Sequence, residues 1–125
     1  MSGKTRIRIE AAVVAGFLAL AGAAAAQDPA VVNAKTIQVK LDNDRVRVLE
    51  AALKPGEKEQ LHSHPAYVVY VVAGGKVRNH LADGKTSETE FKTGDVVYRD
   101  PLTHWAENIG TTTVRFILVE LKSSK

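Results

Sequence analysis

Short extended segments separated by turn residues dominate this chain, and they constrain its fold more than any other feature. After Pro29 no stretch keeps the 3.6-residue hydrophobic period of an amphipathic helix. Residues 31–35 are predicted to form a weakly ordered lead-in. The predicted strands cover residues 36–41, 45–53, 59–64, 67–73, 76–81, 86–91, 96–99, 103–108 and 112–121. Strands this short, at near-even spacing with turn signals between them, indicate an all-β sandwich or barrel in a single domain.

Two local patterns make more specific predictions within this β fold. Residues 67–73 form a continuous run rich in Val and Tyr, which is typical of a strand buried on both faces. Asp83-Gly84 lies between two predicted strands and favours a tight hairpin with a type I′ turn.

Three of the four histidines occur in two blocks that each follow a glycine turn. His62 and His64 are two residues apart in a predicted strand, so their side chains point to the same face of it. His104 comes forty residues later, in another predicted strand. Together the three imidazoles would form a facial metal site with open positions, the pattern of a reactive rather than a structural metal. The alternative is that His62 and His64 form an exposed polar strand end with no ligand role.

The two histidine blocks resemble the two signature motifs of the cupin superfamily, whose members are small β-barrels built on a jelly-roll plan. The first family motif is G-x5-H-x-H-x3,4-E-x6-G, and the matching positions here are Gly56, His62, His64 and Gly75. The second is G-x5-P-x-G-x2-H-x3-N, and the matching positions are Gly94, Pro101, His104 and Asn108. This second block is one residue shorter than the motif between glycine and histidine, and it lacks the motif's second glycine. The resemblance covers residues 46–121.

The resemblance implies a jelly-roll barrel that holds a divalent transition metal through His62, His64 and His104. Three neutral imidazoles without a carboxylate suit Fe(II), Zn, Ni or Cu, and suit Mg or Ca poorly. Some thiol dioxygenases and diketone-cleaving enzymes of the superfamily also rely on three histidines. When the motif spacing is counted back from Gly75, Val68 occupies the position of the family's glutamate. We expect Val68 to face the same interior as the histidines, so that Val68→Glu would strengthen metal binding.

The other candidate residues are interpreted mainly as structural. We expect His80 to lie at the surface or at a hairpin end rather than among the ligands, and Glu57 and Glu59 to be solvated turn charges. Asn108 is predicted to be a hydrogen-bonding residue and not a ligand. Trp105 is expected to point away from the face that carries the candidate ligand beside it. The aromatic residues more often serve core or cross-strand packing than line a pocket; they are Tyr67, Tyr70, Tyr98 and Trp105.

These observations leave two functions open. The first is a metal-dependent enzyme, of oxygenase or isomerase type, that acts on a small polar organic molecule. The second is a non-catalytic module that binds a small ligand or the metal itself. An enzyme needs a general acid or base near the metal, and the sequence offers no inward carboxylate in the first motif. A homodimer is also expected, since so small a chain without cysteine depends on its core, a metal or a second subunit for stability.

Residues 1–26 have the features of a secretory signal peptide. A basic segment with Lys4, Arg6 and Arg8 precedes an apolar stretch at residues 11–20, and small residues up to Ala26 form a cleavage site. The apolar stretch is shorter than the roughly 20 residues of a spanning helix, which disfavours an uncleaved membrane anchor. We therefore expect a cupin domain at residues 27–125, periplasmic or secreted and free of the membrane after cleavage. Its 14 basic and 13 acidic residues give no basis for nucleic acid binding.

The mature exported protein is predicted to begin near Gln27, because the small-residue run that ends at Ala26 fits a signal peptidase site. The intact mass and N-terminal sequence of the exported protein measure this directly. A product that retains Met1 in a membrane fraction would contradict the prediction.

Overall fold

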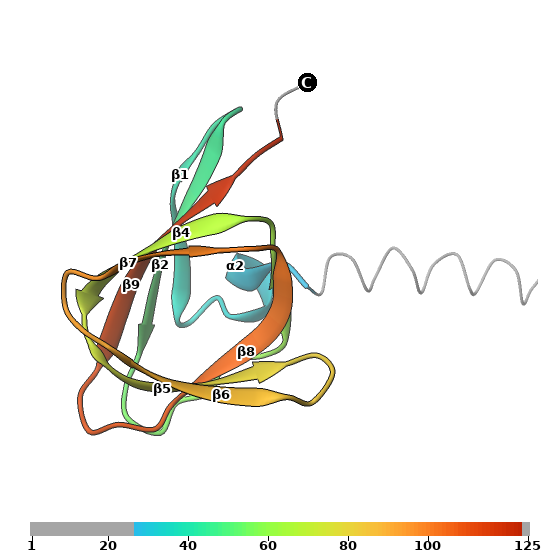
Figure 1. Cartoon of the computed structure of the whole chain (residues 1–125). Helices are drawn as coiled ribbons and strands as arrows, with labels where there is room; N and C mark the ends of the chain where they lie inside the picture. Colours follow the sequence, from blue (N-terminus) through green and yellow to red (C-terminus); the bar gives the residue numbers. More distant parts are fainter. Residues whose placement is uncertain (1–26, 124–125) are drawn as a thin grey trace, which may run out of the picture.

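Two antiparallel β-sheets packed face to face form the fold in the computed structural model, which describes residues 27–123 (Figure 1). The five-stranded sheet has the order β1-β2-β9-β4-β7, and the four-stranded sheet has the order β3-β8-β5-β6. The strands are β1 (Ile37–Asp42), β2 (Val46–Leu53), β3 (His62–His64), β4 (Tyr67–Ala73), β5 (Gly75–Leu81), β6 (Thr86–Phe91), β7 (Val96–Arg99), β8 (Leu102–Asn108) and β9 (Val114–Leu121). The predicted all-β jelly-roll class is confirmed, although the two sheets do not close into one continuous barrel. The predicted signal peptide, residues 1–26, lies outside the described residues.

The predicted strands correspond one to one with the observed strands. Three of them, β4, β6 and β7, have the predicted ends, and most of the others differ by one or two residues. The first histidine strand is the exception, since β3 begins only at His62 instead of at residue 59. The residues before it keep single contacts with β8, among them the hydrogen bond from Glu59 N to the carbonyl of Ala106 (2.9 Å). This segment is therefore extended alongside β8 without forming a regular ladder.

A short helix occupies the first part of the irregular lead-in predicted for residues 31–35, and turns follow at residues 33–36. Helix α2 (Pro29–Val32) is capped by Asp28, whose carboxylate accepts a hydrogen bond from Ala30 N. Pro29 fits the first helical turn, where its missing N–H has no intrahelical acceptor to lose. Four residues are too few for a hydrophobic period to be visible, which is why the sequence pattern missed this helix. Across residues 27–123, no helix has both the length and the apolar character needed to span a membrane.

Strand β4 is buried on one face only, so the prediction of burial on both faces is wrong. Its inner face carries Tyr67, Val69 and Val71, which are all buried. Tyr70 and Val72 on the other face are exposed. The continuous apolar run therefore reflects a core-facing side together with an apolar outer side on which Tyr70 and Val72 stay exposed within residues 27–123.

The β5–β6 hairpin does not contain the predicted type I′ turn. That turn needs a positive φ at both central residues, and no non-glycine residue in the described chain has one, Asp83 included. Within this hairpin loop, Gly84 is the residue with a positive φ, of 90°. The Gly84 N–H donates to the carbonyl of Leu81, and Leu81 N–H donates to the carbonyl of Lys85. These bonds define a three-residue loop that ends in a glycine bulge.

The hydrophobic core fills the space between the inner faces of the sheets. One buried cluster contains Ile37, Leu49, Ala51, Tyr67, Val69 and Leu118, and a second contains Leu53, Val77 and Val114. Full burial of a Leu or Val side chain contributes about 1.5–3 kcal/mol. Asn108 closes one end of the core: its Nδ2 donates to the carbonyls of Leu53 and Thr112 (2.8 Å each), and its Oδ1 accepts from Gly110 N. The predicted structural role of this motif residue is confirmed.

Candidate metal centre

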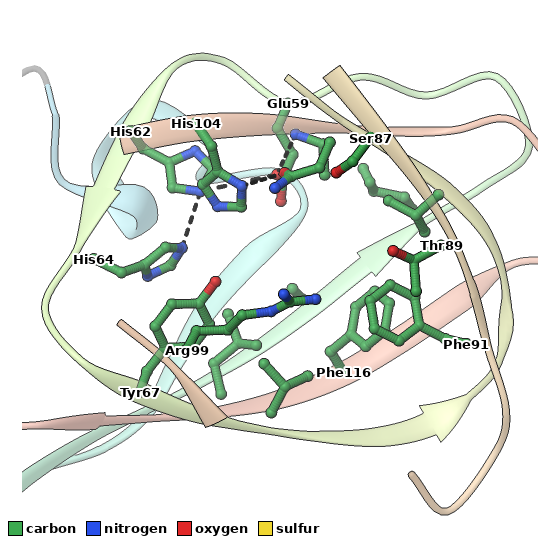
Figure 2. A pocket seen from close by; sticks show the side chains of 17 residues that line it. Glu59, His62, His64, Tyr67, Ser87, Thr89, Phe91, Arg99, His104 and Phe116 are labelled. Atoms are coloured by element: carbon green, nitrogen blue, oxygen red, sulfur yellow. Dashed lines mark hydrogen bonds and ion pairs between the residues drawn. The ribbon is translucent and has the colours of Figure 1, made fainter. Parts of the chain in front are cut away.

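The three predicted ligands lie on a single two-stranded ladder. Strand β3 pairs with β8 so that His62 is directly opposite His104, and His64 is two residues further along β3. Directly opposite residues of antiparallel strands share a face, as do residues two apart on one strand. All three side chains accordingly point between the sheets, where they are 1%, 4% and 9% exposed. Figure 2 shows the rings gathered at one end of the cavity, and their ligand nitrogens lie within 4.8 Å of one another.

Each imidazole has a hydrogen-bond acceptor behind its Nδ1 atom. The pairs are His62 with the Gln60 carbonyl (2.7 Å), His64 with the Glu120 carboxylate (2.6 Å) and His104 with the Asn79 side-chain oxygen. A carbonyl or carboxylate oxygen can only accept, so these contacts assign the proton to each Nδ1. His62 Nδ1 also lies 3.1 Å from the donor Nδ2 of Asn33, but the contact with the Gln60 carbonyl is the shorter one and decides the assignment. The three Nε2 atoms are therefore left with free lone pairs that point into the cavity.

Two of these lone pairs face each other at short range. The Nε2 atoms of His62 and His64 are 3.1 Å apart, with no proton between them when both rings donate through Nδ1. Facing lone pairs repel, and a cation between them removes that repulsion. A metal about 2.0–2.1 Å from each imidazole nitrogen accommodates a separation of this size. The donor set therefore fits a divalent transition metal.

Burial keeps two of the imidazoles, those of His62 and His104, neutral. Desolvation lowers the pKa of His62 to about 4. Desolvation, reinforced by the neighbouring His62 and His64, lowers the pKa of His104 to about 2. A metal binds the neutral form of imidazole, so no proton has to leave these two rings when a metal binds at neutral pH.

Glu59 belongs to the site, and the expectation that it is a solvated turn charge is wrong. Its side chain is buried and lines the cavity. One carboxylate oxygen accepts a hydrogen bond from Ala106 N (2.9 Å) and lies 3.8 Å from His62 Nε2. Burial raises the pKa of Glu59 to about 7. Because this segment is extended but irregular, neither strand alternation nor the motif spacing pointed to an inward carboxylate here.

Val68 does not face the histidines, which makes the predicted gain of metal affinity in Val68→Glu wrong. Its neighbours Tyr67 and Val69 line the cavity, and Val68 lies on the opposite face of β4. After His64 the chain crosses from the four-stranded to the five-stranded sheet within residues 65–66. Strand alternation does not carry across that crossing. The longer spacing that the family motif allows, with four residues after the second histidine, leads to Val69.

The remaining candidates divide between the cavity and the outer surfaces. Tyr67 lines the cavity, whereas Tyr70 and Tyr98 are exposed on the outside of the five-stranded sheet. His80 stacks on Trp105 with ring centroids 3.6 Å apart. Neither residue lines the cavity, which confirms that Trp105 points away from the ligand face and places His80 outside the cluster of three histidines.

The cavity extends from the histidines between the two sheets. Its volume is about 80 Å³. A cavity needs about 10–15 Å³ to hold one water molecule, so this cavity has room for a small organic molecule. Phe91 and Phe116 form an apolar wall away from the histidines, and Arg99 reaches in from β7 (Figure 2). Ser87 and Thr89 add polar groups from the edge strand β6.

Comparison with known proteins establishes the family. The family model described as Cupin domain matches residues 49–120, more than half of the chain. The chain belongs to the cupin family. A cupin domain from Bordetella pertussis Tohama I is 27% identical, with a TM-score of 0.64 over 70% of this chain and 92% of that chain. A conserved protein with a double-stranded β-helix domain from Klebsiella pneumoniae is 25% identical, with a TM-score of 0.56 over 67% and 73% of the two chains.

A more distant cupin shares the fold. An RmlC-like cupin family protein from Methanocaldococcus jannaschii is 18% identical, with a TM-score of 0.56 over 69% of this chain and 78% of that chain. A search of curated proteins finds no match to this chain.

The buried titrating groups predict how the stability of the metal-free protein depends on pH. His62 and His104 have lowered pKa values, so around pH 5.5 the unfolded chain binds nearly two protons that the folded chain excludes. Glu59 has a raised pKa, so around the same pH the folded chain keeps one proton that the unfolded chain has released. The net excess of one proton in the unfolded state makes stability rise with pH, by about 1.4 kcal/mol per pH unit from these groups.

Glu59→Gln should make this pH dependence about twice as steep, because the opposing proton on the folded state is removed while the amide oxygen can still accept from Ala106 N. Urea unfolding in EDTA between pH 4.5 and 8 measures the slope. Glu57→Gln is the matched control, since the Glu57 carboxylate accepts from Lys54 N in a neighbouring turn and does not line the cavity. Equal slopes in wild type and Glu59→Gln would contradict the assignment of Glu59 as a buried titrating group.

Proposed function

We propose that the protein is an exported metal-dependent enzyme, of oxygenase or isomerase type, that acts on a small polar organic molecule. The observation that carries this proposal is the convergence of three Nε2 lone pairs in a buried cavity of small volume. Export, to the periplasm or beyond, rests on the predicted signal peptide at residues 1–26.

His62, His64 and His104 would hold Fe(II), Zn, Ni or Cu, which suit nitrogen donors better than Mg or Ca does. When bound, such a metal supplies a Lewis acid that polarises an oxygen atom of the bound molecule. The acceptors behind the rings, above all the Glu120 carboxylate, keep the imidazoles oriented and make them stronger donors. The two sheets form the walls of the cavity and limit the access of bulk water to it.

Glu59 favours an enzyme over a module that only captures a ligand. A general acid or base must lie within reach of the reacting atoms, with a pKa near the working pH. Glu59 lines the cavity beside His62, and burial raises its pKa to about 7. Burying a carboxyl group is unfavourable, and a passive binding module has no need of it. In the proposed enzyme, Glu59 takes a proton from the bound molecule or returns one to it.

Metal binding is predicted to stabilise the fold, because the three histidines come together only in the folded chain. At about 100 times the dissociation constant, a metal should add roughly 2.7 kcal/mol to the free energy of unfolding. Thermal melting in EDTA and with added Fe(II), Zn, Ni or Cu measures this effect. His104→Ala should abolish the metal-dependent rise.

His80→Ala provides the matched control, because His80 stacks on Trp105 away from the cavity. This variant should keep the full metal-dependent rise. If no metal moves the melting temperature of the wild type at neutral pH, or if His104→Ala responds as the wild type does, the proposed metal site is wrong.

We also propose that the chain forms a homodimer through the outer face of its five-stranded sheet. Cross-strand register aligns one apolar residue from each strand in an uninterrupted row: Leu41, Val48, Val119, Val68 and Tyr98. Leu41 and Tyr98, at the two ends of the row, are 50% and 59% exposed. An apolar row without charge is complementary to a second copy of itself across a two-fold axis.

Sedimentation velocity is expected to show a dimer for the wild type and a monomer for Tyr98→Glu, because a charge in the apolar row would be desolvated at the interface. Lys85→Glu in the exposed β5–β6 hairpin is the control and should remain dimeric. A monomeric wild type, or an unchanged dimer in Tyr98→Glu, would contradict this interface.

A further inference from the structure

We propose that the cavity binds a small organic acid, whose carboxylate pairs with Arg99 and whose second oxygen function is directed to the three histidines. This inference rests on the proposed function, and it specifies the class of molecule that the site accepts.

Arg99 lies at the end of the edge strand β7, directly opposite Tyr67 of β4. Its side chain lines the cavity, and Figure 2 shows the guanidinium group extending past the Tyr67 ring into the space below the histidines. The guanidinium therefore lies in the same part of the cavity as the candidate metal ligands.

Within residues 27–123, the Arg99 guanidinium makes no ion pair and no hydrogen bond. Other arginines of the fold are differently placed. Arg47 forms two hydrogen bonds with the carboxylate of Asp28 (2.8 and 3.0 Å), and Arg78 pairs with Glu88. In the same part of the chain Arg45 also makes no such pair, but it is exposed to solvent, whereas Arg99 lines the cavity. The free donors of Arg99 are therefore available to a bound molecule.

The two buried carboxylates near the histidines do not neutralise Arg99. Glu120 accepts a hydrogen bond from His64 at 2.6 Å. Glu59 accepts from Ala106 N and lies on the His62 side of the cavity. A divalent cation held beside Arg99 would give the cavity an excess of positive charge. An anionic ligand restores neutrality in a space where an unpaired charge is costly.

The shape and chemistry of the donors favour a carboxylate. A guanidinium group presents two parallel N–H donors that match the two oxygens of a carboxylate. Tyr67 supplies a third donor nearby, because its side chain lines the cavity and a phenolic O–H can donate a hydrogen bond. The cavity volume of about 80 Å³ limits the molecule to a few non-hydrogen atoms. Short 2-oxo and 2-hydroxy acids combine a carboxylate, a second oxygen and a small apolar body that can contact Phe91 and Phe116.

The test uses calorimetric titration of the full mature protein with pyruvate and lactate, and with the uncharged amides pyruvamide and lactamide. Each titration is made on metal-loaded protein and on protein in EDTA. We expect at least one acid to bind about tenfold or more tightly than its amide, since hydrogen bonds between charged groups are the strong ones. Arg99→Gln should weaken binding of that acid by about tenfold to a hundredfold.

Two further variants separate recognition from folding. Arg99→Lys keeps the charge without the paired donors, and it should bind the acid more weakly than the wild type but more tightly than Arg99→Gln. Arg115→Gln is the control, because Arg115 pairs with Glu50 and does not line the cavity. This variant should bind the acid as the wild type does. Thermal melting of each variant verifies that it is folded.

The outcomes distinguish this inference from the proposed function. If neither acid binds more tightly than its amide, or if Arg99→Gln binds as the wild type does, the carboxylate site is wrong, even when metal binding is confirmed. If no metal binds but an acid still binds through Arg99 in EDTA, the proposed metal-dependent function fails and the carboxylate site stands.

Discussion

Three imidazole lone pairs directed at one buried point constitute the interaction on which the rest of this site depends. The β3–β8 ladder brings His62, His64 and His104 to one face, and the acceptors behind the rings leave each Nε2 atom without a proton. The Nε2 atoms of His62 and His64 are 3.1 Å apart, a separation that a metal bound to both nitrogens would accommodate. Burial disfavours the charged form of His62 and His104, so these two rings do not relieve the repulsion by taking up a proton from water.

The groups around the histidines have separable tasks. Glu120 orients His64 from the opposite sheet, and Glu59 places a carboxyl group beside His62. Arg99 introduces a positive charge on the Tyr67 side of the cavity. The candidate centre is thus flanked by a group that can exchange a proton and by a group that can hold an anion. This division is typical of sites that bind a molecule in one orientation and act on it.

The histidines were predictable from the sequence, and the carboxylates were not, for a physical reason. A period of two along β3 and the motif spacing place His62, His64 and His104 without knowledge of the fold. Glu120 reaches His64 only because β9 lies in the sheet opposite β3, which is a property of the topology. The expectation that Val68 faces the histidines was wrong because the chain changes sheets at residues 65–66, and strand alternation does not continue across that change. Glu59 was missed because regular alternation does not extend upstream of β3.

Anomalous diffraction from crystals of the metal-loaded protein, recorded at the absorption edge of the bound metal, tests the central claim most directly. The expected result is one strong peak about 2.0–2.2 Å from the Nε2 atoms of His62, His64 and His104. A peak elsewhere, such as beside His80 on the outer face, or contact through Nδ1 instead of Nε2, would contradict the account. The absence of any peak near the three histidines in crystals that contain the metal would contradict it equally.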